Sequence, residues 1–356
     1  MSSISIDNPN DNLNINNNLG PDLIQKDVNK VFNNSLQLNK YLGNENYTSV
    51  YQGIYNSKTN KSEDVIVKVI PRNDVENFNK LLFEIGFIKY LSKFKSSKKY
   101  ICLCYSVKLT DKFLIIIQEK PPGIPLSEFI KQIITYDMKK YYTYIIFIMY
   151  HLLLGINYIH YKGVSHRNIN PENIYINFEN EKIKDIKMTD FAVACGKYYS
   201  LTTLSNKEFK KTSDFYFCET FNYLNNPPET FNIDDLVARI EKIASNQPRE
   251  ITYLYLAKKA DIWALGILFW KLCSYNKKLS LENPLNIEFP KNYQTDQSWR
   301  LFKGSVEDNP IIQKIFEIIN KLMLCEIPNR ENSDVILESF IIINKYYDDE
   351  DEDLQE

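Results

Sequence analysis

The chain has 356 residues, of which 44% are hydrophobic, and this is enough to build a large core in one domain or two. A formal net charge of −2 excludes a general electrostatic attraction to nucleic acid or to anionic membranes. The six cysteines are scattered without the density of a disulfide scaffold, so we expect core thiols and a reducing, cytoplasmic compartment.

The beginning of the chain predicts no packed structure. Residues Met1 to about Val31 are rich in Asn, Asp and Ser, so they bury too little apolar surface to offset the entropy of ordering. We therefore expect residues 1–36 to form a disordered arm. The N-terminus is polar and shows no secretory signal.

The next hundred residues or so predict a small β-sheet with a helix beside it. Tyr41–Gly53 contains two strand-like runs around a turn, which is typical of a hairpin. Asp64–Ile70 is a β-branched run around a single lysine, Lys68; a lone strand lysine is usually just solvent-facing. Further predicted elements are a helix at Leu81–Ile88, and strands at Ile101–Leu109 and Phe113–Gln118.

Two segments with helical periodicity follow, Leu126–Ile134 and Met138–Tyr161. Part of the second, Tyr144–Tyr161, is the one candidate for a membrane span, but polar residues such as His151 and His160 interrupt it. We favour a buried helix and expect no association with a membrane.

A polar loop then carries several functional groups into one place. Val164–Asn173 lies between the apolar helix and a strand-like run, and loops of this kind often contact ligands. A second strand, Ile186–Thr189, leads to Asp190. The carboxylate of Asp190 and the amide oxygen of Asn173 could together hold a divalent metal.

At these residues the sequence resembles the catalytic loop and the metal-binding motif of eukaryotic-type protein kinases, H-R-D-L-K-P-E-N and D-F-G. The resemblance covers about Leu38 to Tyr346 and leans toward the serine/threonine branch. It implies an α+β fold with two lobes, a small antiparallel sheet with one helix and a larger, mainly helical lobe. The implied boundaries are 37–119 for the small lobe, 120–123 for the hinge, 124–346 for the large lobe with an insertion at about 230–257, and 347–356 for an acidic tail.

The resemblance also implies a site for ATP and Mg²⁺. Lys68 matches the lysine that binds the α- and β-phosphates, and Glu84 matches its partner on the helix, with Glu76 as an alternative. Glu119 would offer its carbonyl group to adenine. The implied ATP-binding set is Leu42, Gly43, Val50, Lys68, Glu84 and Glu119, and the implied metal ligands are Asn173 and Asp190.

Several positions depart from the family pattern, and most of them lie at the γ-phosphate end of the implied site. Ala192 replaces the glycine of D-F-G. Asn168 stands where the family has the aspartate that accepts the substrate proton, and an amide cannot take up a proton at neutral pH. Asn170 replaces the catalytic-loop lysine and removes a positive charge from the transferring phosphoryl group. Glu45 and Thr48 occupy glycine positions of the phosphate-covering loop, and Pro121 lacks an N–H that the hinge usually presents.

Residues with architectural roles in the family are retained. Glu229 matches a glutamate that pairs with an arginine near the end of the fold, here Arg330. Asp261 opens the Asp261–Trp270 segment and matches the aspartate that anchors the backbone of the catalytic loop. The implied structural set is His166, Arg167, Phe191, Glu229, Asp261 and Arg330.

Two functions fit these residues. The first is a pseudokinase, a binding or allosteric module that holds ATP but transfers phosphate poorly or not at all. The alternative is an active serine/threonine protein kinase in which water or another group replaces the missing base. We favour the first, because the losses gather at the γ-phosphate end while the architectural residues remain. The expected partners are ATP and an unknown protein partner or substrate, without nucleic acid.

Overall fold

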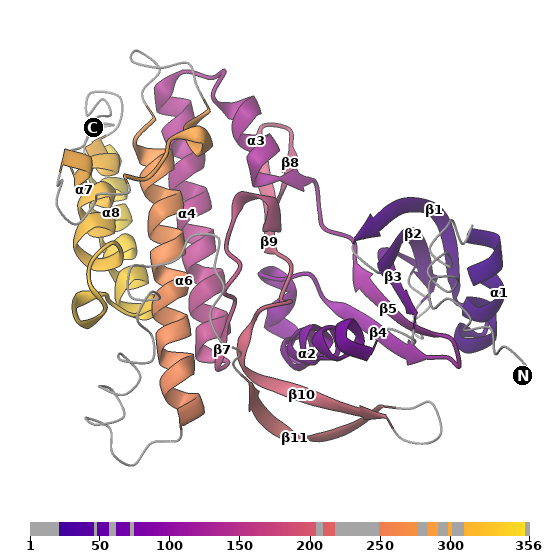
Figure 1. Ribbon diagram of the computed structural model, residues 1–356. Helices are drawn as coiled ribbons and strands as arrows, with labels where there is room; N and C mark the ends of the chain where they lie inside the picture. Colours follow the sequence, from indigo (N-terminus) through magenta and orange to yellow (C-terminus); the bar gives the residue numbers. More distant parts are fainter. Residues whose placement is uncertain are drawn as a thin grey trace, which may run out of the picture. The chain divides into compact units, whose positions relative to one another are not determined.

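The computed structural model describes residues 21–45, 48–56, 62–71, 75–203, 209–217, 249–275, 283–290, 298–300 and 310–352, and Figure 1 shows their helices and strands. The chain divides into two compact units, and each is described by itself. The first comprises residues 1–78, 104–120 and 203–209, and the second comprises residues 79–103, 121–202 and 210–356.

The first unit is built on a five-stranded antiparallel sheet with the strand order β1-β2-β3-β5-β4. Val50 on β2 lies opposite Lys68 on β3, and Lys68 in turn lies opposite Ile116 on β5. The strands are β1 (Leu36–Glu45), β2 (Thr48–Asn56), β3 (Ser62–Pro71), β4 (Cys104–Leu109) and β5 (Phe113–Glu119). The sequence predicted these strands because β-branched and aromatic residues dominate them.

A helix that the sequence analysis missed covers one face of this sheet. Residues 1–36 were expected to be a disordered arm, but α1 spans Pro21–Phe32 (Figure 1). Ile24, Val28 and Phe32 recur at intervals of four, so they form one apolar stripe, and they are buried against core residues of β3 and β5. The stripe was missed because most residues of the segment are polar. Residues 1–20 lie outside the described part of the chain.

Gln25 fixes α1 to the edge strand β1. Its side-chain amide donates to the carbonyl oxygen of Leu36 at 3.1 Å and accepts from the backbone N–H of Leu38 at 2.8 Å. These bonds satisfy backbone groups at the start of an edge strand, where unpaired groups are a liability.

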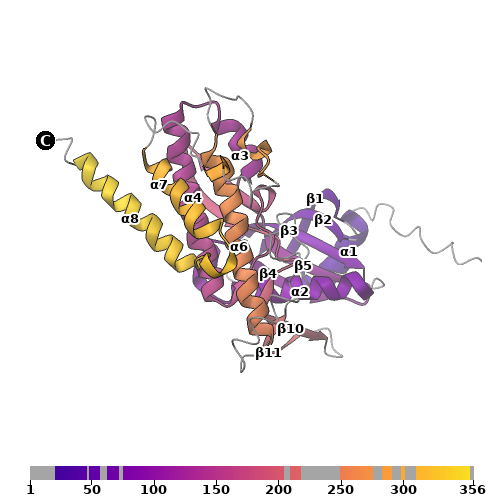
Figure 2. The ribbon, with the colours of Figure 1, turned by 60° about the vertical axis from the view of Figure 1, so that its left-hand side comes forward.

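The second unit is mainly helical, and its long helices α4, α6 and α8 pack together (Figure 1). Figure 2 shows that the C-terminal part of α8 extends beyond its neighbours. The α-helices are α3 (Leu126–Ile133), α4 (Met138–Tyr161), α6 (Arg249–Cys273), α7 (Pro310–Ile318) and α8 (Ser333–Glu352); α2 (Val75–Ser92) begins in the first unit and continues in the second. The short helices are η1 (Lys95–Lys99), η2 (Pro171–Asn173), η4 (Pro284–Asn286), η5 (Ser298–Arg300), the π-helix η6 (Ile319–Met323) and η7 (Ile327–Asn329).

Helix α4 is the segment whose apolar sequence raised the membrane alternative. It is the one helix of the described residues that is long and apolar enough to span a membrane. However, 56% of its apolar 18-residue stretch is buried inside the protein. The hydroxyl groups of Tyr141 and Tyr142 donate to the carbonyl oxygens of Leu272 and Tyr275, each at 3.1 Å. The helix therefore contributes to the core of the second unit.

Two small sheets complete this unit and carry the functional loop. The first has the order β6-β8-β9, from β6 (Ile124–Pro125), β8 (Ile174–Glu179) and β9 (Lys182–Met188). The second has the order β11-β10-β7, from β7 (Val164–Ser165), β10 (Cys195–Thr203) and β11 (Phe209–Phe217). Gly123 precedes β6 with φ +68°, and an added Cβ would lie 2.0 Å from the carbonyl oxygen of Ile176, so glycine is required there.

The predicted α+β fold, with a small antiparallel sheet and a larger helical part, is confirmed. Several boundaries differ from the prediction. Residues 79–103, which we expected in the small lobe, belong to the second unit. Helical structure also runs further than the sequence indicated. Residues 249–257, which we assigned to an insertion, are the first turns of α6, and α8 continues through Glu352 into the expected acidic tail. The remainder of the insertion lies outside the described residues.

The cysteines differ from one another in their state. Cys102, Cys104, Cys273 and Cys325 are free thiols, as expected. Cys195, at the start of β10, is disulfide-bonded, so the expectation of core thiols is wrong for this residue. Burial raises the pKa of the Cys273 thiol above its usual range, so this thiol stays protonated and unreactive.

The burial of α1 predicts that it is part of the cooperative core. Phe32→Ala should lower the free energy of unfolding by about 3 kcal/mol or more, because it leaves a cavity between the helix and the sheet. Urea denaturation measures this loss. Lys30→Ala on the exposed side of the same helix is the matched control and should change stability by less than about 0.5 kcal/mol. Equal, small effects of the two substitutions would show that α1 does not belong to the folded core.

Candidate functional site

The loop from β7 to η2 has an unusual backbone. Arg167 has φ +66°, and Asp190, which follows β9, has φ +64°. Residues other than glycine rarely adopt this left-handed region, which costs roughly 1 to 2 kcal/mol for each. Such strain persists where the surroundings impose it, and it is concentrated at functional sites.

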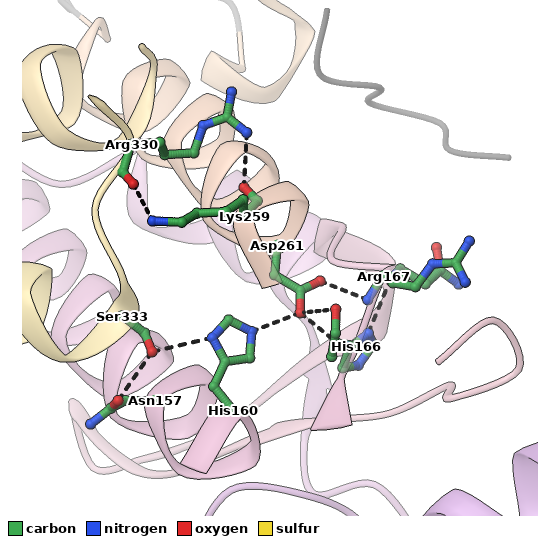
Figure 3. A network of polar contacts seen from close by, with 10 residues as sticks. Asn157, His160, His166, Arg167, Lys259, Asp261, Arg330 and Ser333 are labelled. Atoms are coloured by element: carbon green, nitrogen blue, oxygen red, sulfur yellow. Dashed lines mark hydrogen bonds and ion pairs between the residues drawn. The ribbon is translucent and has the colours of Figure 1, made fainter. Parts of the chain in front are cut away.

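The carboxylate of Asp261 imposes the conformation of this loop through hydrogen bonds to its backbone (Figure 3). Its Oδ1 accepts a hydrogen bond from the backbone N–H of Arg167 at 2.7 Å. Its Oδ2 accepts from the backbone N–H of His166 at 2.8 Å and from the hydroxyl of Ser165 at 2.7 Å. Asp261 lies on α6 and is 1% exposed, so α6 fixes three consecutive loop residues through one buried group.

His160, near the end of α4, gives the fourth contact to Asp261. Its Nε2 lies 2.9 Å from Oδ2 of Asp261, and its Nδ1 lies 3.2 Å from the hydroxyl of Ser333, which also contacts Asn157 (Figure 3). From the sequence, His160 was interpreted only as a polar interruption of an apolar helix. The sequence offered only a histidine in an apolar segment, six residues before His166, and this fits a core histidine equally well.

Burial and hydrogen bonding shift the pKa values of this network. Burial by itself would raise the pKa of Asp261, but the hydrogen bonds from His160 and Ser165 hold that pKa below its ordinary value. Burial lowers the pKa of His160 and of His166, although nearby carboxylates act in the opposite direction. The network is therefore built around an ionised aspartate and neutral histidines at pH 7.

Side-chain amides of the loop form a chain of hydrogen bonds that ends at Asp190. Nδ2 of Asn168 donates to Oδ2 of Asp190 at 2.6 Å, and Oδ1 of Asn168 accepts from Nδ2 of Asn170 at 3.0 Å. Asn170 in turn accepts from the backbone N–H groups of Glu172 and Asn173, at 2.9 and 3.2 Å, and so caps η2. The Asn-Pro-Glu sequence is a typical cap with proline at the first helical position, a signal that the sequence analysis did not use.

Asp190 accepts further hydrogen bonds from its neighbours. Nδ2 of Asn173 lies 3.4 Å from the same Oδ2, and the backbone N–H of Ala192 lies 3.2 Å from Oδ1. Phe191, which follows Asp190, is buried with its ring centroid 4.5 Å from that of His166. The Asp-Phe-Ala segment is thus held against the loop from both sides.

The residues present fit a divalent cation by type, but their hydrogen bonds oppose it. A carboxylate and an amide oxygen are ligands that Mg²⁺ accepts, and waters and phosphate oxygens usually complete its shell. Asn173, however, presents its Nδ2 to Asp190, so its amide group has to turn before its oxygen can share a cation with Asp190. Among the described residues, no group of three His, Cys, Asp or Glu could hold a metal by itself.

Arg330 is buried near the other end of the network (Figure 3). Its guanidinium group donates to the carbonyl oxygen of Lys259 at 3.0 Å and to that of Cys325 at 2.8 Å, and it lies 4.8 Å from the ring of Trp263. Nζ of Lys259 donates back to the carbonyl oxygen of Arg330. The expected partner Glu229 lies outside the described residues, so its ion pair with Arg330 remains a prediction.

The expected nucleotide-contacting residues of the first unit lie on its strands. Val50 and Thr48 are buried on β2, Lys68 is partly buried on β3, and Leu42 is 48% exposed on β1. Gly43, also on β1, has φ +139° and open space where a Cβ would lie. Glu119 is the last residue of β5.

Glu84 lies on α2 in the second unit and is buried, with 5% exposure. Because the two units are described separately, the pairing of Lys68 with Glu84 remains a prediction.

Comparisons with known proteins identify the family of this chain. A family model described as "Protein kinase domain" matches residues 36–333. "Serine/threonine-protein kinase AKL1" of Saccharomyces cerevisiae is 24% identical over 268 residues, which cover 73% of this chain and 21% of that protein.

The relatives from Dictyostelium discoideum include the following two. "Probable serine/threonine-protein kinase nek1" is 22% identical over 277 residues, which cover 71% of this chain and 47% of that protein. "Probable serine/threonine-protein kinase fhkA" is 26% identical over 248 residues, which cover 66% and 37%. The chain therefore spans less than half the length of these relatives.

The buried carboxylate of Asp261 predicts a large loss when its charge is removed. In Asp261→Asn an N–H₂ group must face N–H and O–H donors, so the free energy of unfolding should fall by about 3 kcal/mol or more. Asp185→Asn, an exposed position on β9, is the matched control. Chemical denaturation of both variants tests the role of Asp261, and an Asp261→Asn protein as stable as the control would refute it.

The buried histidines predict that the protein loses stability in mild acid. Their pKa values are lowered by folding, so the unfolded chain binds more protons as the pH falls below about 6.5. The free energy of unfolding should therefore decrease between pH 7.5 and pH 5.5, and His160→Gln should make that decrease smaller. Denaturation curves across this range measure the effect, and a flat profile for the unmodified protein would contradict it.

Proposed function

Because this chain belongs to the protein kinase domain family, we propose that it is a pseudokinase, a module that binds ATP and a protein partner with little or no phosphate transfer. The family and the serine/threonine kinase relatives make a kinase-like protein the premise. The loss of phosphate transfer is our inference from the catalytic loop.

The amide of Asn168 carries this proposal. Its nitrogen donates to Asp190 and its oxygen accepts from Asn170, so both ends are engaged inside the loop. An amide cannot accept a proton at neutral pH, and here its oxygen already accepts a hydrogen bond from Asn170, which holds it in one orientation. Loss of a general base costs about 10²- to 10⁴-fold in rate.

Asn170 supports the proposal in a second way. It occupies the position of the catalytic-loop lysine, and its side chain caps η2 instead of extending toward a phosphate. The transferring phosphoryl group therefore loses a positive charge as well as a base, and electrostatic stabilisation is usually the largest single contribution to catalysis.

Nucleotide binding is the part of the family function that we propose is kept. Lys68 and Glu84 would bind and order the phosphates, Glu119 would contact adenine, and Leu42, Gly43 and Val50 would cover the ligand. Asn173 and Asp190 are the residues that would hold Mg²⁺, with an affinity weakened by the hydrogen bonds that Asp190 accepts from Asn168 and Asn173. We also propose an intracellular location, because the described cysteines other than Cys195 are free thiols.

An active serine/threonine kinase is the second candidate. The fixed conformation of the loop backbone favours it. Asp261 holds the backbone at His166 and Arg167, and Asp190 retains a carboxylate at the family's metal position, although it accepts a hydrogen bond from Asn168. Metal and positioning contribute much of phosphoryl transfer, so a water molecule could replace the base. The engaged amide of Asn168 makes this the weaker candidate.

A transfer assay with labelled ATP and Mg²⁺ separates the two candidates. The unmodified chain should show no autophosphorylation and no transfer to a basic protein substrate above the level of Lys68→Ala. Restoring the base and the charge with Asn168→Asp and Asn170→Lys together should raise transfer by about 10²-fold. Robust transfer by the unmodified chain that Lys68→Ala abolishes would reject the pseudokinase. A thermal shift on adding ATP separately reports whether nucleotide binds.

A further inference from the structure

The carboxylate of Asp190 is already well supplied with hydrogen bonds by its own chain. Oδ2 accepts from Asn168 at 2.6 Å and from Asn173 at 3.4 Å, and Oδ1 accepts from the backbone N–H of Ala192 at 3.2 Å. An ionised carboxylate has about four acceptor sites, so three of them are in use. The group at the centre of the expected metal site is thus satisfied by N–H donors.

The direction of these hydrogen bonds follows from chemistry. An ionised carboxylate only accepts, so the amide nitrogen of Asn168, and not its oxygen, has to face Asp190. The oxygen of Asn168 then faces Asn170, whose nitrogen donates to it at 3.0 Å. Asn170 uses its own oxygen for two backbone N–H groups. Each amide in the chain is therefore held in one orientation by the next, and the last N–H is aimed at Asp190.

An aspartate at position 168 would change the sign of this contact. Two carboxylates at the 2.6 Å separation now spanned by Asn168 and Asp190 would repel each other unless a cation or a proton lay between them. An amide of nearly the same shape removes the repulsion and replaces it with a charge-assisted hydrogen bond. One side-chain substitution therefore removes the need for a cation at this place.

We infer that Asn168 substitutes for a divalent cation at Asp190, so that the loop and the Asp-Phe-Ala segment keep their arrangement without bound metal. A cation that enters the site has to break the hydrogen bond from Asn168 and turn the amide of Asn173. Where the proposed nucleotide binding holds, the ligand is then a nucleotide that does not require a divalent cation.

Metal binding in the absence of nucleotide tests this inference directly. Mn²⁺ titrations of the full chain, followed by electron paramagnetic resonance, should show weak or no binding to the unmodified protein. Asn168→Asp should bind Mn²⁺ at least about tenfold more tightly, because the site gains an anionic ligand and loses a competing N–H donor. Asn180→Asp adds the same charge in the exposed turn between β8 and β9 and should behave like the unmodified protein.

Thermal melting provides a second readout that does not depend on activity. The unmodified chain should melt at the same temperature in EDTA and in Mg²⁺. Asn168→Asp should melt lower in EDTA and recover in Mg²⁺. Should Asn168→Asp fail to fold under either condition, Asn168→Ala replaces it, since this variant removes the donor without adding charge and should still gain Mn²⁺ affinity.

Tight Mn²⁺ binding by the unmodified protein, or no gain in either variant, overturns the inference. Neither result touches the pseudokinase proposal, which depends on the missing proton acceptor and is decided by phosphate transfer. The ATP-induced thermal shift, repeated in EDTA, reports on nucleotide: loss of that shift in EDTA alone would also contradict metal-independent binding.

Discussion

The second unit depends on one buried carboxylate. Asp261 is almost fully removed from water, and an ionised group in that position is tolerable only when its hydrogen bonds are complete. Ser165, His166 and Arg167 supply three of those bonds and His160 supplies the fourth. The same bonds that satisfy Asp261 hold Arg167 in the left-handed region, so α4, α6 and the loop are fixed together. The conformation of the loop is thus determined before any ligand is present.

The side chains of the loop form a second set of hydrogen bonds, which does not involve Asp261. A loop positioned by Asp261 presents Asn168, Asn170 and Asn173 beside Asp190, and these amides bond to one another and to the carboxylate. In a working kinase this place needs a group that takes a proton and a cation that neutralises phosphate. Here the amide of Asn168 stands at the position of the proton acceptor, and it donates a hydrogen bond to Asp190, the expected ligand of the cation. One structural feature, the chain of hydrogen bonds that ends at Asp190, therefore links the departure at the proton-acceptor position with the altered metal site.

Sequence reasoning reached the α+β fold and the strands of the first unit, because β-branched runs such as Asp64–Ile70 carry a strong local signal. It missed α1, since Ile24, Val28 and Phe32 lie in a polar segment and become informative only when the sheet that buries them is known. The motif placed Asp261 under the loop, but His160 and Ser333 could not be assigned, because a histidine in an apolar helix fits a satisfied core residue equally well. The contact of Asn168 with Asp190 joins residues 22 positions apart, and its direction depends on which amide atoms face each other.

A crystal structure of the full chain, grown with a non-hydrolysable ATP analogue and Mg²⁺, tests the central claim most directly. The account predicts that Nδ2 of Asn168 stays within hydrogen-bond distance of Oδ2 of Asp190, with no cation shared by Asn173 and Asp190. A cation coordinated by both residues, with Asn168 turned toward the γ-phosphate, would contradict it.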